Sequence, residues 1–238
     1  MPSEHPLPQE QGQITLYSFF MITDACIFVN QDGTVTPHRM LLAAKSCGIS
    51  RVIICSSASS SYIPGSYAGV TVLRGKVIGR QIDRPFLDAV RKSPAGCVVM
   101  VNAGENSFNR TAITTKGVHF LTGIAELPRG GFDHIVAKMA ADHLTGVVFD
   151  LSRIISPKSR RIALSRYAEI LIMQRKYQFP LVIASGSDSL YGMKNPAEMV
   201  ALCSLFGMTR VEVYAALHGL DAVLSPPKTV TVVSEGEL

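Results

Sequence analysis

The stretch GVVFDLSRIISPKSRRIALSRYAEILIMQRKYQFPLVIASGSDS, residues 146–189, sets the fold class of this chain. It opens with an apolar run at 146–150 and closes with another at 181–184, and a long segment with helical periodicity lies between them. The two apolar runs show no alternation of polar and apolar residues, which is typical of strands that are buried on both faces. A strand, a long helix and a second strand in this order predict a parallel pair joined by a helical crossover.

The same rhythm covers most of the chain. Apolar runs at residues 22–29, 52–55, 97–101 and 118–121 alternate with helical patterns at 84–91, 107–115 and 133–143, and two closing helices are expected at 196–206 and 211–217. At least six strands separated by helices favour an α/β fold in which a distorted, TIM-barrel-like parallel β/α barrel closes on itself. A core of this size fits one domain, which we assign to residues 21–225.

Local signals mark several element boundaries. Thr36 and Pro37 supply an N-cap and a first-turn proline for a helix that should end at Gly48. Thr209 stands three residues before Glu212, the spacing of a capping box. The runs 70–73 and 76–78 flank Arg74-Gly75, which predicts a hairpin turn or a bend.

Composition limits the class of protein. The chain has 238 residues, 47% hydrophobic content, a net charge of +5 and a pI near 9.0, so an acidic partner is favoured, although the field is modest. Its five cysteines stand singly and are expected to be reduced core residues. No apolar run is long enough to span a membrane, and we expect a soluble, cytoplasmic protein.

The two ends differ in composition from the rest of the chain. Residues 1–20 are expected to form a mobile N-terminal extension, since their start is rich in proline, glutamate and glutamine, and residues 226–238 a C-terminal tail. Met21, directly before the first expected strand, is an alternative start of the native protein.

Motifs for catalysis are scarce. The six histidines form neither an HxH nor an HExxH pattern, and no Gly-x-Ser-x-Gly elbow is present. Asp133-His134 is explained by a capping aspartate followed by a first-turn histidine. The Ser185–Ser189 loop follows a strand and should lie at the C-terminal rim of the barrel, where such folds place their working loops, although a tight turn is the favoured explanation of its sequence.

Residues 22–56 are similar to the first strand-helix-strand of the polymerase and histidinol phosphatase superfamily, whose metal centre begins with an Asp-x-His-x-His pattern. Here Asp24 remains, but Cys26 and Phe28 occupy the two histidine positions. A phenyl ring cannot bind a metal, and a thiol does not replace an imidazole nitrogen. We therefore expect the scaffold of that superfamily without its hydrolase chemistry.

A basic cluster begins the helix that we expect at residues 157–177. Lys158, Arg160 and Arg161 would stand in its first turn, where each cation opposes the helix dipole by a few tenths of a kcal/mol. An anionic ligand would compensate this effect, although exposed cations on a solvated face are also inexpensive.

Residues 118–224 resemble archaeal ribonuclease P protein component 3. The resemblance runs through Gly131-Phe132-Asp133-His134, the strand end Asp150-Leu151-Ser152-Arg153, the basic helix, the Ser185–Ser189 loop, Asn195-Pro196 and Gly207-Met208. The family has basic residues near its loop-helix junctions. The matching positions, expected to contact RNA or a protein partner, are Arg110, Arg129, Lys138, Arg153, Lys158 and Lys194, with Arg160 and Arg161 as further candidates.

The resemblance implies a protein subunit of ribonuclease P, which supports the catalytic RNA while it removes the 5′ leader of precursor tRNA. It implies no catalytic residue and no cofactor on this chain, since magnesium is expected on the RNA. The implied partners are ribonuclease P RNA, a Pop5-type protein subunit, other ribonuclease P proteins and, indirectly, precursor tRNA. An aromatic content of 7% without tryptophan argues against a platform that stacks single-stranded bases.

Two other functions remain open. One is a metal-dependent phosphoesterase of the related superfamily, using Asp24, His119 and His134. The other is a barrel that binds only proteins, which explains the basic helix less well. The metal content of the purified protein would distinguish the phosphoesterase from the ribonuclease P subunit. RNA that co-purifies with the protein would distinguish the ribonuclease P subunit from a barrel that binds only proteins.

Overall fold

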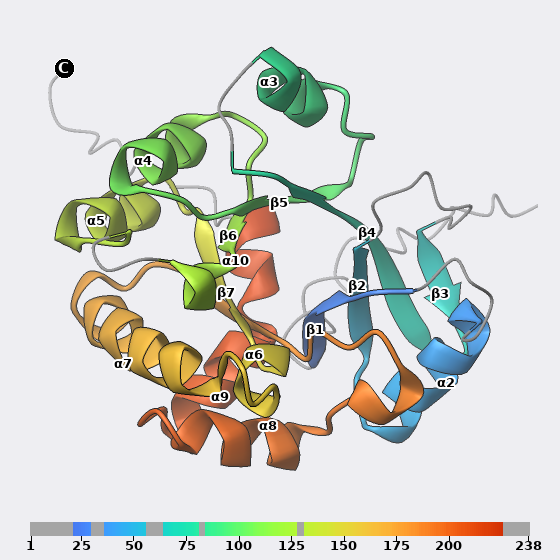
Figure 1. The fold of residues 1–238 in the computed structure, drawn as a ribbon. Helices are drawn as coiled ribbons and strands as arrows, with labels where there is room; N and C mark the ends of the chain where they lie inside the picture. Colours follow the sequence, from blue (N-terminus) through green and yellow to red (C-terminus); the bar gives the residue numbers. More distant parts are fainter. Residues whose placement is uncertain (1–20, 30–35, 56–63, 81–83, 128–130, 226–238) are drawn as a thin grey trace, which may run out of the picture.

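The computed structural model describes residues 21–29, 36–55, 64–80, 84–127 and 131–225, and shows a ring of strands surrounded by helices (Figure 1). The strands are β1 (Thr23–Ile27), β2 (Arg51–Cys55), β3 (Gly65–Tyr67), β4 (Val70–Ile78), β5 (Val98–Asn102), β6 (Phe120–Thr122), β7 (Gly146–Asp150) and β8 (Leu181–Ala184). The α-helices are α2 (Pro37–Ser46), α3 (Arg84–Arg91), α4 (Asn106–Thr114), α5 (His134–Asp142), α6 (Ser152–Ile155), α7 (Arg160–Tyr177), α8 (Pro196–Ser204), α9 (Arg210–His218) and α10 (Leu220–Leu224). Two short 3₁₀ helices are η1 (Ile124–Glu126) and η2 (Leu190–Gly192).

The sheet confirms the predicted parallel β/α barrel. Its strands follow the order β1-β2-β4-β5-β6-β7-β8, and every pair along this path is parallel. The ring closes between β1 and the loop after β8, where the Phe28 N–H donates to the Ser187 carbonyl at 2.7 Å and the Gly186 N–H to the Cys26 carbonyl at 3.1 Å. The mobile extension and the tail predicted at residues 1–20 and 226–238 lie outside the described residues.

The turn predicted at Arg74-Gly75 is wrong. β4 runs without interruption from Val70 to Ile78, and Gly75 lies so close to Ile53 and Cys55 of β2 that a Cβ atom would overlap both side chains. The glycine therefore serves close packing between strands rather than a turn. The hairpin lies earlier, where β3 pairs antiparallel with β4 across Ala68 and Gly69, both with positive φ, as a two-residue type I′ turn requires.

Two apolar layers explain why the strands lack alternation. Ile53, Met100 and Phe120 point into the ring with the other interior side chains, whereas Leu121 and Phe149 belong to the larger layer between the ring and the helices. Each strand is thus covered on both faces. All five cysteines are free thiols, and four of them are buried.

The helix α10 closes the end of the ring where the strands begin, and it appears inside the ring in Figure 1. Leu220 is fully buried and packs, together with Val223 and Leu224, against the interior side chains. The Arg51 guanidinium, at the start of β2, holds this helix through two hydrogen bonds to the Asp221 carboxylate at 2.8 and 3.0 Å. Arg51 Nε also donates to Thr23 Oγ1 at 2.9 Å.

The helix boundaries follow most of the predicted signals. Thr209 and Glu212 form the expected capping box, and Gly48 has the positive φ expected of a residue after a helix end. Thr36 occupies the N-cap position of α2, but its side chain makes no capping hydrogen bond. Within the described residues, no helix combines the length and apolar character needed to cross a membrane.

The long basic helix expected at residues 157–177 is interrupted at its start. The chain forms the short helix α6, leaves the helical conformation at Ser156, and resumes as α7 at Arg160. Pro157 explains the break, because a proline disfavours the helical conformation in the preceding residue, and Ser156 has a ψ of 121°. Lys158 therefore precedes α7 instead of lying in its first turn.

Candidate functional site

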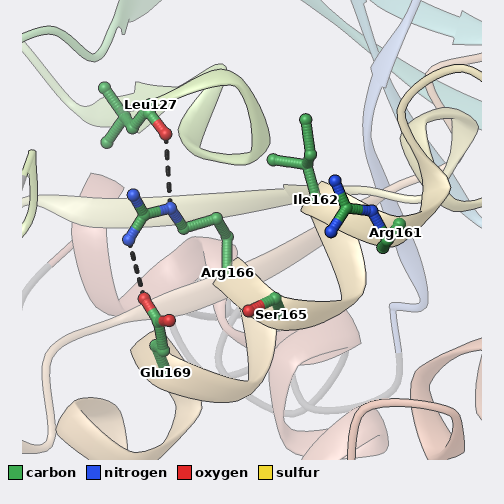
Figure 2. A pocket seen from close by; sticks show the side chains of 6 residues that line it. All are labelled: Leu127, Arg161, Ile162, Ser165, Arg166 and Glu169. Atoms are coloured by element: carbon green, nitrogen blue, oxygen red, sulfur yellow. Dashed lines mark hydrogen bonds and ion pairs between the residues drawn. The ribbon is translucent and has the colours of Figure 1, made fainter. Parts of the chain in front are cut away.

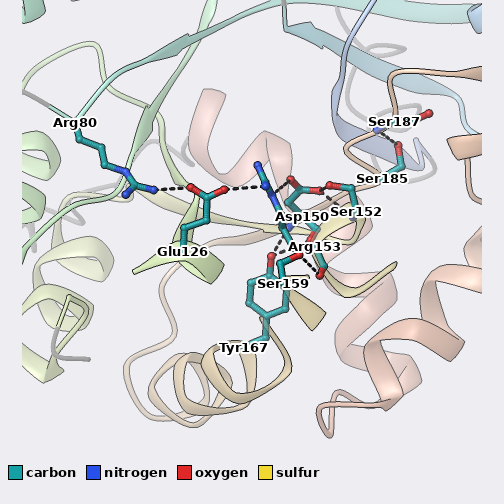
Figure 3. A network of polar contacts seen from close by, with 9 residues as sticks. All are labelled: Arg80, Glu126, Asp150, Ser152, Arg153, Ser159, Tyr167, Ser185 and Ser187. Carbon is teal, nitrogen blue, oxygen red and sulfur yellow. Dashed lines mark hydrogen bonds and ion pairs between the residues drawn. The ribbon is translucent and has the colours of Figure 1, made fainter. Parts of the chain in front are cut away.

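A network of ion pairs crosses the C-terminal rim of the barrel (Figure 3). Glu126 in η1 joins two arginines from different loops: its carboxylate contacts Arg80 Nη2 at 2.7 Å and Arg153 Nη1 at 2.8 Å. Arg153 Nε also contacts the carboxylate of Asp150, at the end of β7, at 3.3 Å. The side chains of Arg80, Glu126 and Arg153 are each about 40% exposed, so this charged network faces solvent.

Asp150 is the buried end of this network. Its Oδ1 accepts hydrogen bonds from the Ser152 N–H at 2.9 Å and the Ser152 hydroxyl at 2.6 Å. Burial raises the pKa of Asp150 even though these bonds and Arg153 favour the carboxylate. The Tyr167 hydroxyl of α7 bonds to the backbone of Asp150, where it accepts from the N–H at 3.0 Å and donates to the carbonyl at 2.9 Å. These contacts fix the carboxyl end of β7 to the helix that covers it.

The serine loop after β8 is a compact turn held by its own hydroxyls. The Ser187 N–H donates to Ser185 Oγ at 3.2 Å, and the Ser187 hydroxyl donates to the Ser189 carbonyl at 2.6 Å. Gly186 has φ +63° and lies against Asp150, so that an added Cβ would overlap the Asp150 carboxylate. The serine hydroxyls are therefore engaged in structure, as the tight-turn interpretation predicted.

Asp24 is a fully buried carboxyl at the closure of the ring. Its Oδ1 accepts from the Ser185 N–H at 2.9 Å, while Oδ2 has no hydrogen-bond partner among the described residues. Burial raises the pKa of Asp24 to about 6, against the lowering effect of the hydrogen bond from Ser185. The protonated form therefore occurs at a higher pH than for an ordinary aspartate.

The residues named for the phosphoesterase alternative do not assemble. His119 directly precedes β6, at the start of the strands, where its Nδ1 accepts from the Val99 N–H at 3.1 Å. His134 is exposed in the first turn of α5, next to the capping Asp133. Across the described part of the chain, no three histidine, cysteine, aspartate or glutamate side chains come close enough to share a metal ion. The orphan oxygen of Asp24 thus lacks companion ligands, and the donor set does not fit the multi-histidine centre of the related superfamily.

The eight residues predicted to contact RNA or a protein partner differ in what their charged groups contact. Arg110 and Arg153 form ion pairs, and Arg160 and Lys194 donate to backbone carbonyls. Lys138, Lys158 and Arg161 are exposed and make no hydrogen bond or ion pair with any described residue. Arg129 lies outside the described residues. The seven described residues come from separate elements: α4, α5, the α6–α7 segment and the loop before α8.

Arg160 shows how the basic helix start is stabilised. Its guanidinium donates to the carbonyls of Ile154 and Ile155 in α6, both at 2.8 Å. These carbonyl groups belong to the end of a helix and carry partial negative charge, so they offset the unfavourable position of Arg160 at the start of α7. An anionic ligand is not needed for Arg160, whereas Lys158 and Arg161 keep their charges free.

Arg110 is held at the start of α5. Its Nη2 contacts the Asp133 carboxylate at 2.9 Å, and Asn106 Nδ2 donates to the same oxygen at 2.9 Å. Asp133 also caps α5 by accepting from the Ile135 and Val136 N–H groups, which confirms the predicted capping role. Burial raises the pKa of Asp133, but the bonds from Val136 and Arg110 outweigh it, so the pKa is lowered overall.

A hollow of about 480 Å³ lies on the outer face of α7 (Figure 2). Arg166 crosses it, donating to the Leu127 carbonyl at 3.2 Å and pairing with Glu169 at 2.7 Å. Arg161 and Ile162 line the hollow near the start of the helix. The hollow places the free cation of Arg161 beside the half-exposed side chain of Ile162. Among the described residues that line it, no nucleophile is hydrogen-bonded to a base, so these residues suit contact rather than catalysis.

Three rim residues were not predicted from the sequence as site residues. Arg80 and Glu126 lie in connections whose positions depend on the ring, and Tyr191 in η2 has a side chain that is 95% exposed. Neither a glutamate two residues before a proline nor an isolated tyrosine carries a recognisable sequence signal. Only the folded barrel brings these residues to one rim.

Comparison with known proteins gives one consistent family. The family model described as RNase P subunit p30 matches residues 21–225. Ribonuclease P protein component 3 of Methanococcoides burtonii is 34% identical over 122 residues, which cover 50% of this chain and 51% of that protein. The Methanosarcina mazei component 3 is 26% identical over 214 residues, 87% of each chain. The component 3 of Methanothermobacter thermautotrophicus is 29% identical over 63% of each chain, so the matches to it and to the M. burtonii protein span less than two thirds of those relatives.

Two solved structures share the fold. A chain in the cryo-EM structure of archaeal ribonuclease P with mature tRNA superposes with a TM-score of 0.63 at 16% identity, covering 90% of this chain and all of that one. The histidinol phosphate phosphatase of Lactococcus lactis, solved with zinc, L-histidinol and phosphate, superposes with a TM-score of 0.50 at 11% identity, covering 77% of this chain and 92% of that one. At these identities the likeness concerns the fold alone.

Proposed function

Because the chain belongs to the RNase P subunit p30 family, we propose that it is a protein subunit of ribonuclease P. In this role it supports the catalytic RNA during removal of the 5′ leader from precursor tRNA and carries no catalytic residue itself. The observation that carries the proposal is the family match over the whole barrel, residues 21–225.

The RNA is proposed to contact the C-terminal rim and the adjacent start of α7. Lys158 and Arg161 are the strongest candidates for phosphate contacts, because both are exposed and neither has a partner within the described residues. Contacts between cations and phosphates release counterions and carry no sequence information. Arg153 and Arg110 are already neutralised by carboxylates, so a phosphate would have to compete with those ion pairs.

The test compares two pairs of exposed cations at different ends of the barrel. Lys158→Ala/Arg161→Ala should weaken binding of ribonuclease P RNA and make the slope of log affinity against log salt shallower by roughly 1.4 to 1.8, at about 0.7 to 0.9 per phosphate contact. Arg91→Ala/Lys92→Ala removes the same charge at the end of α3 and should leave the slope unchanged. Equal slopes for both variants and the unmodified protein would place the RNA contact elsewhere.

A Pop5-type subunit is the proposed protein partner, together with other ribonuclease P proteins. Its support is the family membership, and the described residues do not identify the partner surface. Light scattering on a mixture of the two proteins at micromolar concentration should detect a stable complex. If no complex forms, and the chain also fails to stimulate precursor tRNA cleavage by the RNA, the proposed assembly role is wrong.

The magnesium requirement is proposed to belong to the RNA. Cys26 and Phe28 stand where the related superfamily has histidines, and Asp24 lacks companion ligands among the described residues. Elemental analysis of the purified chain should find no stoichiometric divalent metal. Tightly held metal with phosphoesterase activity that is lost in Asp24→Ala would instead support the phosphoesterase alternative.

A further inference from the structure

Tyr191 is the most exposed large hydrophobic side chain in the described part of the protein. Its side chain is 95% exposed, whereas Tyr67 is 40% exposed and Tyr167 only 1%. It lies in η2, in the loop that follows β8, and therefore at the C-terminal rim. A ring with this exposure is not held in the core, so both of its faces are open to a ligand.

The backbone below this ring is held rigidly. Lys194 Nζ donates to three successive carbonyls, those of Tyr191 at 3.4 Å, Gly192 at 2.7 Å and Met193 at 3.3 Å. The Gly192 N–H donates to the Ser189 carbonyl at 3.2 Å, and the adjacent Met193 is buried in the core. A ring presented by a fixed backbone loses little conformational entropy when a ligand stacks on it.

A second aromatic residue lies beside the same loop. The Phe28 N–H at the end of β1 donates to the Ser187 carbonyl at 2.7 Å, and the Phe28 side chain is 37% exposed. This residue occupies one of the positions where the related superfamily has a histidine. The seam between β1 and the loop after β8 thus presents partly exposed aromatic surface.

The surroundings of Tyr191 indicate which ligand it suits. Its neighbours Asp188, Ser189 and Lys194 are polar, and the charges of Asp188 and Lys194 have opposite signs. The centre of a protein interface is apolar and depleted of charge, which does not describe this loop. A nucleobase, in contrast, can stack on a single flat ring, and such stacking accepts any base. The most exposed aliphatic side chains do not lie in this loop. They are Ile172 in α7, Leu205 at the end of α8 and Val211 in α9.

We propose that Tyr191 stacks against an unpaired nucleobase of the RNA bound at the rim. This inference rests on the proposed function, because it requires that the chain binds RNA. It also refines the argument from composition. A low aromatic content argues against a platform for a run of bases, but one exposed tyrosine on a well-held backbone is enough for a single unstacked base of a folded RNA.

Binding measurements with three substitutions at Tyr191 test the proposal. In the full chain assembled with its partner proteins, Tyr191→Ala should weaken RNA binding about 5- to 150-fold, the equivalent of about 1–3 kcal/mol per stacked base. Tyr191→Phe should bind within about two-fold of the unmodified protein, because the ring is retained. The salt slope should stay constant in both variants, since stacking releases no counterions. Tyr67→Ala, on the β3–β4 hairpin, is the matched control and should not change affinity.

Tyr191→Trp provides a direct signal, because the chain contains no tryptophan. Its fluorescence should be quenched on titration with the RNA that supplies the base. Catalytic RNA and precursor tRNA are titrated separately, so that the source of the base is identified. Melting curves establish that each variant is folded.

The outcomes separate this inference from the proposed function. If the unmodified protein binds RNA and Tyr191→Ala binds equally well, with no quenching of the tryptophan variant, the stacking site is wrong while the proposed function stands. If Tyr191→Ala changes the salt slope, Tyr191 acts through phosphate contacts and the stacking inference fails. If the assembled protein binds neither RNA, both proposals fail together.

Discussion

The two ends of the barrel use similar charged residues for different purposes. At the end where the strands begin, the side chain of Arg51 is 9% exposed and forms an ion pair with Asp221 of α10, the helix that closes this end of the barrel. At the C-terminal rim, Arg80 and Glu126 form an ion pair whose partners are each 39% exposed. The first pair is shielded from water and fixes the closure of the core, whereas the second is screened and remains accessible to a ligand. Barrel folds commonly divide stability and function between their two ends in this way.

Breaking each of the two ion pairs should show the largest difference in stability between the two ends of the barrel. Arg51→Ala removes the hydrogen bonds from the guanidinium to the Asp221 carboxylate and to Thr23, and should lower the free energy of unfolding by about 3 kcal/mol. Arg80→Ala at the rim should lower it by less than about 1 kcal/mol. Urea denaturation of both variants measures these values. Equal losses would mean that the two ends do not differ in this respect.

Two glycines with positive φ, one at the rim and one away from it, allow the tightness of packing at the rim to be measured. Gly186 lies against the Asp150 carboxylate, whereas Gly207 has open space around its Cα. Gly207→Ala should cost about 1–2 kcal/mol from backbone strain alone. Gly186→Ala adds a steric clash at the rim and should cost roughly 2–4 kcal/mol in total. The difference between the two variants in thermal and urea unfolding gives the cost of the steric clash. A smaller loss of stability for Gly186→Ala than for Gly207→Ala would show that the rim rearranges to accommodate the added methyl group.

Asp24, buried where β1 meets the loop after β8, should make the stability of the protein depend on pH. The pKa of Asp24 is raised from 3.8 to about 6 in the folded protein, so folding favours the protonated form, and this contribution is lost as the pH rises from about 4 to 6. Asp24→Asn does not titrate. Its free energy of unfolding relative to the unmodified protein should therefore rise by roughly 2–3 kcal/mol between pH 4 and pH 7. A difference that stays constant with pH would show that Asp24 is not buried as an unpaired carboxyl.

Much of the fold was predictable because it follows from local patterns. The strands at 146–150 and 181–184 and the helix at 84–91 were placed at their observed ends, and the capping box of Thr209 and Glu212 was recognised from spacing. One error occurred where residues distant in sequence decide the outcome: Gly75 lies within β4 and packs closely against Ile53 and Cys55. The other error is local, since Pro157 ends α6 and delays the start of α7.

The sequence by itself determined the fold class, the family and the list of cations near the loop-helix junctions. These properties depend on hydrophobic period, capping residues and motif order, all of which are local along the chain. Only the tertiary structure decided which charges are free. Arg160 is satisfied by carbonyls of α6, Arg110 by Asp133 and Arg153 by Glu126, whereas Lys158 and Arg161 are left exposed, and Tyr191 is held out by Lys194. The ion pairs of Arg110 and Arg153 form only in the folded barrel, because folding brings together residues that are far apart in the sequence, whereas Arg160 and Lys194 bind carbonyls of nearby residues.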